Sequence, residues 1–180
     1  MMIILLFGTL SMKLIRHYVD TVPHNLCMRK KEPRPRRCRR NWNQLIQSKL
    51  QVYIDTLNTM DDMMARYTWL MEFGKKSAIV PERFKLDEFE VPGCQSQTWL
   101  VPHFTYDDKM YFTADSAALI SKGMVCLLAD VFSNSTRSDI ASFELKELDG
   151  LNLDNLLTPG RRNGVYSMLK VIQSYGSHKD

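Results

Sequence analysis

One cysteine of the chain stands in a setting that favours thiol chemistry. Cys94 follows Gly93 in a Pro-Gly turn, and the next three residues, Gln95, Ser96 and Gln97, are polar and uncharged. Because glycine adopts backbone conformations that other residues avoid, Gly93 can present the thiol at the tip of the turn. A cysteine in such a position reacts as its thiolate, at a rate set by its pKa and its accessibility. The sequence therefore predicts a reactive thiol at Cys94.

Few other residues could assist this thiol in hydrolysis or metal binding. A cysteine hydrolase needs a histidine base, and the chain after residue 41 contains only His103 and His178. A dyad of Cys94 and His103 stays open as an alternative. Cys126 lies in an apolar run, where we expect it to be a small buried residue. Two cysteines fall short of the three or four ligands of a closed zinc site, so we predict neither a metal nor a cofactor.

The basic charge of the chain is confined to its first forty residues. Residues 1–40 contain ten basic and two acidic side chains, whereas residues 41–180 contain fourteen basic and eighteen acidic ones. A nucleic-acid-binding domain carries its positive charge on the folded part, so we expect no nucleic-acid partner. We expect residues 1–40 to be a targeting leader or a disordered basic extension, and residues 41–180 to form one folded domain.

Two stretches of this extension indicate targeting. Residues 1–10 are nearly all apolar but too few to span a bilayer, which suits the hydrophobic region of a secretory signal peptide. Residues 29–40 include eight basic residues and two prolines, so they are expected to stay solvated and non-helical. This order resembles the two-part transit peptide of a plastid, such as an apicoplast, that is reached through the secretory route. A mitochondrial leader and a cytoplasmic protein with a flexible tail are the alternatives, and we expect no membrane span in the mature form.

Before the thiol, the spacing of apolar residues predicts two helices and a short strand. The first helix covers residues 42–60, and the second runs from Asp61 or Asp62 to Gly74. Residues 84–91 mix apolar and charged side chains and are predicted to form an edge strand or an extended segment. The residues expected to face the core from the second helix are Met64, Tyr67 and Met71.

After the thiol, a hairpin leads into a buried helix. Residues 98–101 and 109–114 are predicted to be its two strands. Asp115 or Ser116 is expected to cap a helix over residues 117–132, which is apolar nearly all round and should be buried.

The last predicted element is a helix that begins at Thr158 and Pro159, a capping residue followed by a proline in the first turn. Its expected core residues are Val165, Met168, Leu169 and Ile172. Together, these predicted helices and strands indicate an α+β fold.

Four segments of the chain resemble, in order and spacing, the motifs of the SufE family of sulfur acceptors. They are residues 66–76 (RYTWLMEFGKK), 91–101 (VPGCQSQTWLV), 114–123 (ADSAALISKG) and 157–164 (LTPGRRNG). The chain departs from the family pattern at Ala117, where a second acid is usual, and at Gly160, where serine is usual. The resemblance covers residues 50–176 and implies a SufE/IscU-like single domain, with a small antiparallel sheet flanked by helices.

The resemblance also implies a function that requires no resident cofactor. Cys94 would accept a persulfide from a SufS-type cysteine desulfurase, whose own cofactor is pyridoxal phosphate, and would stimulate that enzyme without being one. The sulfur would pass to an iron–sulfur scaffold complex of the SufBCD type. The residues that would position the loop and the partner are Gly93, Gln95, Ser96, Asp115 and Arg161.

Two other functions remain as alternatives. An iron–sulfur scaffold of the same fold needs about three clustered cysteines, whereas residues 41–180 contain two. A Cys–His hydrolase would need His103 beside Cys94.

Overall fold

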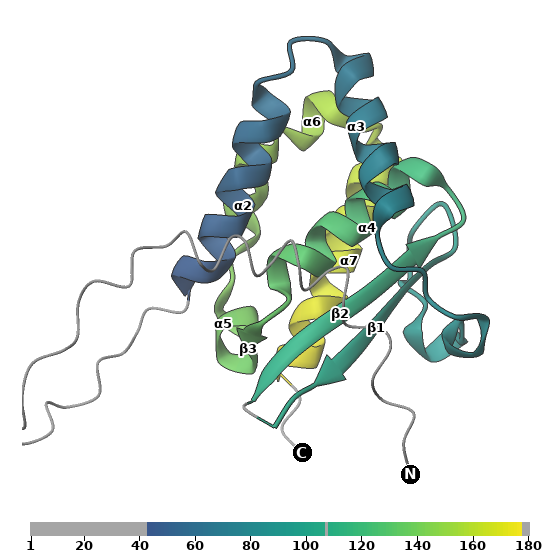
Figure 1. Cartoon of the computed structure of the whole chain (residues 1–180), viewed down its shortest axis with the longest axis vertical. Helices are drawn as coiled ribbons and strands as arrows, with labels where there is room; N and C mark the ends of the chain where they lie inside the picture. The colour runs from purple at the N-terminus through teal and green to yellow at the C-terminus, as the bar shows by residue number, and fades with distance from the viewer. Residues whose placement is uncertain (1–42, 107, 178–180) are drawn as a thin grey trace, which may run out of the picture. The chain divides into compact units, whose positions relative to one another are not determined.

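The computed structural model describes residues 43–106 and 108–177, so the predicted leader lies outside the described residues. Helices precede and follow a small sheet (Figure 1). In chain order the elements are α2 (Asn43–Asn58), α3 (Met63–Lys76), β1 (Thr98–Phe104), β2 (Lys109–Ser116), α4 (Leu119–Phe132), β3 (Ser135–Thr136), α5 (Arg137–Ser142), α6 (Leu153–Leu156) and α7 (Pro159–Ser177). Short 3-10 helices lie at Glu82–Phe84, Asp87–Phe89 and Leu145–Leu151.

The sheet is antiparallel and has the order β1-β2-β3. β1 pairs with β2 from Thr98 opposite Ser116 to Phe104 opposite Met110. β1 is an edge strand, and it tolerates Pro102 because a residue without an N–H can sit where that group would face solvent. The predicted α+β fold with a small antiparallel sheet is thus confirmed, although both hairpin strands extend beyond the residues predicted for them.

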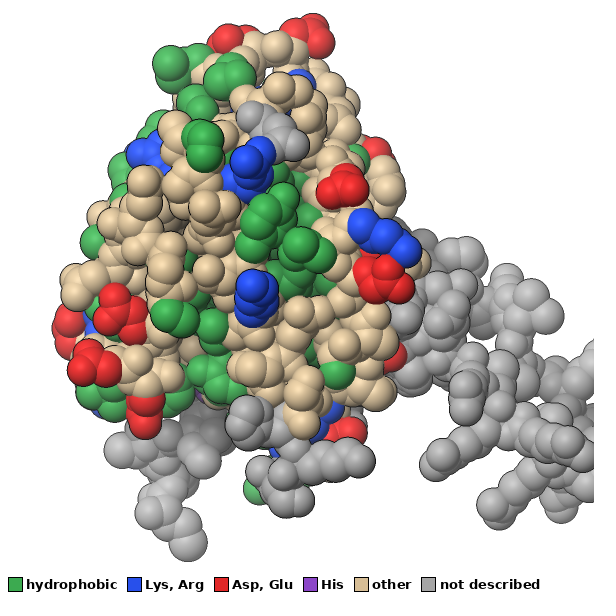
Figure 2. Space-filling model, turned by 180° about the vertical axis from the view of Figure 1, so that it is seen from behind, with side chains coloured by type: hydrophobic (Ala, Val, Ile, Leu, Met, Phe, Trp, Pro, Cys, Tyr) green, Lys and Arg blue, Asp and Glu red, His purple; other side chains and the backbone are tan. Residues whose placement is uncertain are grey.

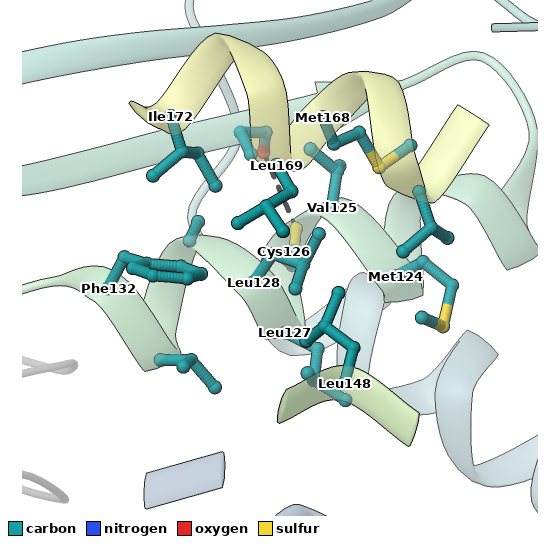
Figure 3. Packing of buried hydrophobic residues seen from close by; sticks show 14 of the residues in the cluster. Met124, Val125, Cys126, Leu127, Leu128, Phe132, Leu148, Met168, Leu169 and Ile172 are labelled. Atoms are coloured by element: carbon teal, nitrogen blue, oxygen red, sulfur yellow. Dashed lines mark hydrogen bonds between the residues drawn. The ribbon is translucent and has the colours of Figure 1, made fainter. Parts of the chain in front are cut away.

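Helix α4 is the buried centre of this fold, as its apolar sequence predicts. Nine of its 14 residues are buried, because α3, β2 and α7 all pack against it. Figure 3 shows side chains of α4 beside those of α7. The buried residues of α7 include the four that the sequence predicts, Val165, Met168, Leu169 and Ile172. Burial of each such aliphatic side chain stabilises the folded state by about 1.5–3 kcal/mol relative to leaving it exposed to water.

Cys126 belongs to this core. Its side chain is 5% exposed, and its thiol donates to the carbonyl of Ala114 at 3.5 Å (Figure 3). Burial raises its pKa to about 11, so this thiol stays protonated at neutral pH. The prediction of a small buried residue is confirmed.

Two glycines bring α3 and α4 into close contact. A Cβ added at Gly123 would lie 2.3 Å from the backbone oxygen of Leu70, and one added at Gly74 would lie 2.8 Å from the backbone nitrogen of Gly123. The prediction that Gly74 ends α3 is therefore wrong, since the helix continues to Lys76. Gly74 is needed for the helix crossing and not for a cap.

Two other predictions about local structure before the thiol are wrong. Residues 84–91 form 3-10 turns, and only Glu90 pairs with a strand, in a bridge to Trp99. Their apolar side chains do not alternate between two faces, and Phe84 and Leu86 are exposed. Met64 is 64% exposed and not in the core, because Leu70 and Gly74 form the buried face of α3.

The predicted start of α4 is also wrong. The helix begins at Leu119, with Ala118 at its N-cap position and no side-chain cap. Asp115 and Ser116 remain in β2, because both continue its pairing with β1. Neither side chain caps the helix.

The surface keeps apolar side chains in several places. On the face seen in Figure 2, hydrophobic side chains gather between Lys and Arg side chains, an arrangement that often marks a contact surface. Ile79, Phe84 and Leu86 are exposed in the segment that precedes the Cys94 loop. In the described part of the chain, no helix is long and apolar enough to cross a lipid bilayer.

Candidate functional site

Cys94 lies in a short loop that is closed by the start of the sheet. The backbone N–H of Val91 donates to the carbonyl of Thr98 at 2.8 Å, and Glu90 bridges to Trp99. Gly93 has a φ of +77°, a left-handed conformation that favours glycine. The loop therefore turns back on itself immediately before Cys94, as the Pro-Gly sequence predicts.

The Cys94 side chain is half-buried at a small cavity between the loop, α4 and α7. Its Sγ atom lies 3.8 Å from the carbonyl oxygen of Gly164. The residues that line the cavity are Cys94, Gln95, Ile120, Ser121, Met124, Leu157, Arg161, Gly164, Val165 and Met168. Most of them are apolar, so the thiol faces mainly apolar groups.

Of the residues that the sequence predicts for the site, Cys94, Gln95 and Arg161 line this cavity together. Gly93 and Ser96 shape the loop beside it. The sequence analysis missed Gly164 as a residue of the cavity. Helical spacing could have found it, because α7 contributes four lining residues at positions i, i+3, i+4 and i+7: Arg161, Gly164, Val165 and Met168.

The surroundings of the thiol favour its protonated form. Burial raises the pKa of Cys94, a hydrogen bond with the Thr98 side chain acts in the opposite direction, and the negative charge of Glu90 raises the pKa further. The result is a pKa above the ordinary value of a thiol. A resting thiol of this kind reacts slowly until a partner or a substrate alters its surroundings.

Gly160 provides space for the neighbour of the thiol. A Cβ at this position would lie 2.3 Å from the Nε2 atom of Gln95. The Gln95 amide therefore rests against the first turn of α7, at the position where the family pattern has serine. A side chain at residue 160 would require the Gln95 amide to move. The observed position of Gln95 therefore depends on a glycine at residue 160.

Asp115 does not belong to the cavity lining, although the sequence analysis grouped it with the site. Its carboxylate is buried and lies 2.9 Å from Lys122 Nζ and 3.3 Å from Lys85 Nζ. The Ser116 N–H donates to it at 2.9 Å, and Lys85 also lies 5.2 Å from the centre of the Trp99 ring. Through these two ion pairs, Asp115 connects Lys85, in the segment before the loop, to Lys122 of α4.

Replacing Asp115 with asparagine should destabilise the domain by about 2 kcal/mol at neutral pH, because both lysines lose their charged acceptor. Burial by itself would raise the pKa of Asp115, but Lys122, the Ser116 N–H and Lys85 outweigh it and the pKa is lowered. A lowered pKa in the folded state gives stability that is present above the unfolded pKa and lost as the pH falls through the folded one.

Urea unfolding from neutral into acidic pH tests this prediction. The difference between wild type and Asp115→Asn should shrink as the pH falls. Asp87→Asn, which changes an exposed carboxylate, should cost little at any pH. Equal stability of wild type and Asp115→Asn at neutral pH would show that the ion pairs of Asp115 with Lys122 and Lys85 do not stabilise the domain.

Replacing Gly164 with alanine should slow the reactions of Cys94 without unfolding the domain. The added Cβ would lie 3.3 Å from the Cys94 sulfur, in space that an incoming reagent or a second sulfur atom needs. Alanine is favoured over glycine in a helix by about 1 kcal/mol, so stability should not fall. We expect the rate of Cys94 alkylation to fall several-fold, while Asn163→Ala, at the exposed neighbouring position, keeps the wild-type rate. An unchanged rate in Gly164→Ala would show that this space is not used.

The alternative hydrolytic dyad has no support in the geometry. His103 lies on β1, five residues beyond Thr98, a separation of roughly 16 Å along a strand. Its Nε2 atom is 2.8 Å from the hydroxyl of Thr113, and His103 is not among the residues that line the cavity. Among the described residues, no group of three or more His, Cys, Asp or Glu side chains is placed to hold a metal ion.

Comparison with known proteins identifies the family of this chain. A model of the SufE family, described as an Fe-S metabolism associated domain, matches residues 51–176. Cysteine desulfuration protein SufE of Wigglesworthia glossinidia brevipalpis is 30% identical over 122 residues, which are 67% of this chain and 85% of that protein. SufE-like protein 1, chloroplastic/mitochondrial, of Arabidopsis thaliana is 31% identical over 130 residues, 72% of this chain but 35% of that protein.

A solved structure shares the fold. The solution structure of a hypothetical protein from Thermus thermophilus has a TM-score of 0.59 and 18% sequence identity, and the match covers 71% of this chain and 93% of that one. The family match takes in the Cys94 loop, all three strands and nearly all of α7. On these grounds the chain belongs to the SufE family, whose domain is associated with iron–sulfur metabolism.

Proposed function

We propose that this protein is a sulfur acceptor of iron–sulfur metabolism and that Cys94 carries the sulfur as a persulfide. The observation that carries the proposal is the position of the Cys94 sulfur, which is half-buried at a mostly apolar cavity in a domain of the SufE family. A carrier must accept sulfur from one partner, protect it, and release it to another. A thiol in a small apolar cavity beside a loop meets these requirements.

The sulfur would come from a SufS-type cysteine desulfurase, which uses pyridoxal phosphate to form a persulfide on its own cysteine. The Cys94 thiolate attacks the outer sulfur of that persulfide. A new S–S bond forms on Cys94 while the S–S bond on the desulfurase breaks, and the desulfurase cysteine leaves as a thiolate. No oxidant or reductant is consumed, and the sulfur stays on Cys94 when the step ends. The protein would therefore act as a carrier that stimulates the desulfurase and not as an enzyme.

The cavity would protect the persulfide after transfer. Exposed thiolates and persulfides are oxidised readily, and Ile120, Met124 and Leu157 would surround the outer sulfur with apolar groups. Arg161 lines the same cavity, and its positive charge would stabilise an anionic outer sulfur. The thiol itself is held by Gly93, whose turn directs it inward.

The other predicted site residues would act on the loop and not on the sulfur. Ser96 accepts a hydrogen bond from Thr98 through its carbonyl at 2.9 Å and so fixes the loop to β1. Gln95 would cover the mouth of the cavity from its place against Gly160. Asp115 would hold the segment before the loop in place.

Mass spectrometry of the Cys94 peptide tests the proposal. After incubation with a SufS-type desulfurase and free cysteine, the peptide should gain the mass of one sulfur atom, and the Cys126 peptide should not. The acquired sulfur should then move to a SufBCD-type scaffold complex. A protein that binds iron on its own would favour the scaffold alternative, and an acyl adduct on Cys94 would favour a hydrolase.

We further propose that residues 1–40 direct the protein to a plastid through the secretory route. The apolar stretch and the basic stretch that follows it support this proposal, and the name of the Arabidopsis relative includes chloroplastic/mitochondrial. A fusion of residues 1–40 to a fluorescent protein should enter the organelle, and deletion of residues 1–10 should leave it in the cytosol. Diffuse fluorescence of the intact fusion would refute targeting, and a mitochondrial signal would refute the secretory step.

A further inference from the structure

The cavity beside Cys94 is small enough to limit what the thiol can carry. Its volume is about 10 Å³, and a space of roughly this size holds a single water molecule. A sulfur atom is somewhat larger than the oxygen atom of water. The cavity therefore has room for one sulfur atom beyond the thiol and not for a second.

The walls on the inner side of the cavity cannot easily recede. A Cβ added at Gly164 would lie 3.3 Å from the Cys94 sulfur, so the backbone of α7 passes directly beside the thiol. Met124, Val165 and Met168 also line the cavity and are at most 2% exposed. Side chains packed this closely move apart only at a cost in free energy. A longer sulfur chain therefore has no space on this side.

The mouth of the cavity is partly covered by Gln95. This residue lines the cavity and is also exposed, so it lies between the thiol and the solvent. Its amide group rests against Gly160 of α7, at a place where a Cβ would overlap it. A second added sulfur would have to displace this amide group.

The charge of the carried group favours the same limit. A persulfide is anionic on its outer sulfur, and of the described residues that line the cavity Arg161 alone is charged. With one added sulfur, the negative charge lies within the cavity that Arg161 lines, where opposite charges attract strongly. With two added sulfurs, the charge would move to a further atom for which this cavity has no room.

We propose that the cavity restricts Cys94 to a single added sulfur and that Ile120 and Leu157 set this limit. Both line the cavity, Ile120 from the first turn of α4 and Leu157 from the segment before α7. Ile120 is partly buried and Leu157 is 6% exposed, so they are less deeply buried than the methionines and Val165. The inference rests on the proposed function, in which Cys94 carries a persulfide.

The chemistry of sulfur loading permits longer chains, so the limit must come from the protein. The Cys94 thiolate attacks a sulfur atom of the donor, an S–S bond forms on Cys94, and an S–S bond of the donor breaks as its remaining part leaves with the electron pair. The persulfide on Cys94 could attack a second donor in the same way. No oxidant or reductant is needed for either step, and the walls of the cavity oppose the second product.

Loading with an inorganic polysulfide tests this limit without a desulfurase. The full chain is incubated with sodium tetrasulfide, the reagent is removed, and the adducts are capped with iodoacetamide in urea. Mass spectrometry then counts the sulfur atoms on the Cys94 peptide. In the folded wild type, the one-sulfur adduct should exceed longer adducts by at least about tenfold. The same chain loaded in urea should carry longer adducts in comparable amounts, because the walls are then absent.

Variants that enlarge the cavity should lengthen the sulfur chain. Ile120→Ala and Leu157→Ala each remove most of a side chain from the wall, and each should raise the share of the two-sulfur adduct about tenfold. Leu119→Ala is the matched control, because Leu119 is the neighbouring residue of α4, is 45% exposed and does not line the cavity. It should keep the wild-type distribution. A thermal melt identifies the variants that fold, and the two cavity variants change different segments of the chain.

Three results would overturn the limit: no sulfur on Cys94 of the folded wild type, the same distribution in the folded and unfolded wild type, or a wild-type distribution in a cavity variant that folds. Failure of the proposed function would give a different result. A wild type that takes one sulfur from tetrasulfide but none from a desulfurase would refute the function and leave the limit intact.

Discussion

Replacement of Cys94 by serine should abolish sulfur acceptance and the stimulation of the desulfurase, while the melting temperature changes little. Serine has the same shape, but its alkoxide is not formed at neutral pH and it cannot hold a persulfide. Cys94 is half-buried and its thiol makes a weak bond to Gly164 at 3.8 Å, so little stability should be lost. The measurements are the rate of alanine formation by the desulfurase and a thermal melt of the variant.

Cys126→Ser provides the matched control for this experiment. It changes the buried thiol of α4, at a cost of about 1–3 kcal/mol for placing a hydroxyl in an apolar core. The low end of this range is expected, because the Ala114 carbonyl, 3.5 Å from the sulfur, can accept the hydroxyl proton. This variant should be less stable but should still accept sulfur. Loss of transfer in a Cys126→Ser protein with an unchanged melting temperature would contradict the division of roles between the two thiols.

Replacement of Gly123 by alanine should have the largest effect on stability. The added Cβ would lie 2.3 Å from the carbonyl oxygen of Leu70, a backbone atom that cannot rotate away. α3 and α4 would have to separate, and α4 is the centre of the core. We expect a loss of about 3–4 kcal/mol in the free energy of unfolding.

The measurement for this prediction is the midpoint of urea unfolding, with Gly164→Ala as the matched control in α7. Both variants gain helix propensity, but the Cβ of the control meets a sulfur atom at 3.3 Å and not a backbone atom. The midpoint of the control should therefore not fall. If Gly123→Ala also keeps its midpoint, the two helices do not cross as closely as these distances require.

The sequence was most informative where structure depends on residues close together in the chain. The apolar run of α4 predicts a buried helix, and Thr158 with Pro159 predicts the start of α7, which begins at Pro159. The Pro-Gly turn predicts the loop of Cys94, whose Gly93 has the expected positive φ. Each of these depends on local backbone preference or on a single periodic pattern.

The sequence was least informative where distant segments decide the outcome. Aspartate is a residue type that often caps helices, and Asp115 precedes an apolar helical run. In the structure, however, Lys85 and Lys122 form ion pairs with its carboxylate and the strand continues through it. Glycine is a residue type that often ends helices, but Gly74 lies within α3 and contacts Gly123 of another helix. The contact between Gln95 and Gly160 likewise joins two segments whose proximity depends on the whole fold. Local propensities are weak compared with such contacts.

The most direct test of the account is a single-turnover transfer of labelled sulfur. A SufS-type desulfurase is loaded with radiolabelled sulfur from cysteine, free cysteine is removed, and the full chain is added. The account predicts that the label leaves the desulfurase and appears on the Cys94 peptide in equal amount, and that a chain alkylated beforehand at Cys94 receives none. Label that stays on the desulfurase, or that is released as sulfide without passing through Cys94, would contradict the account.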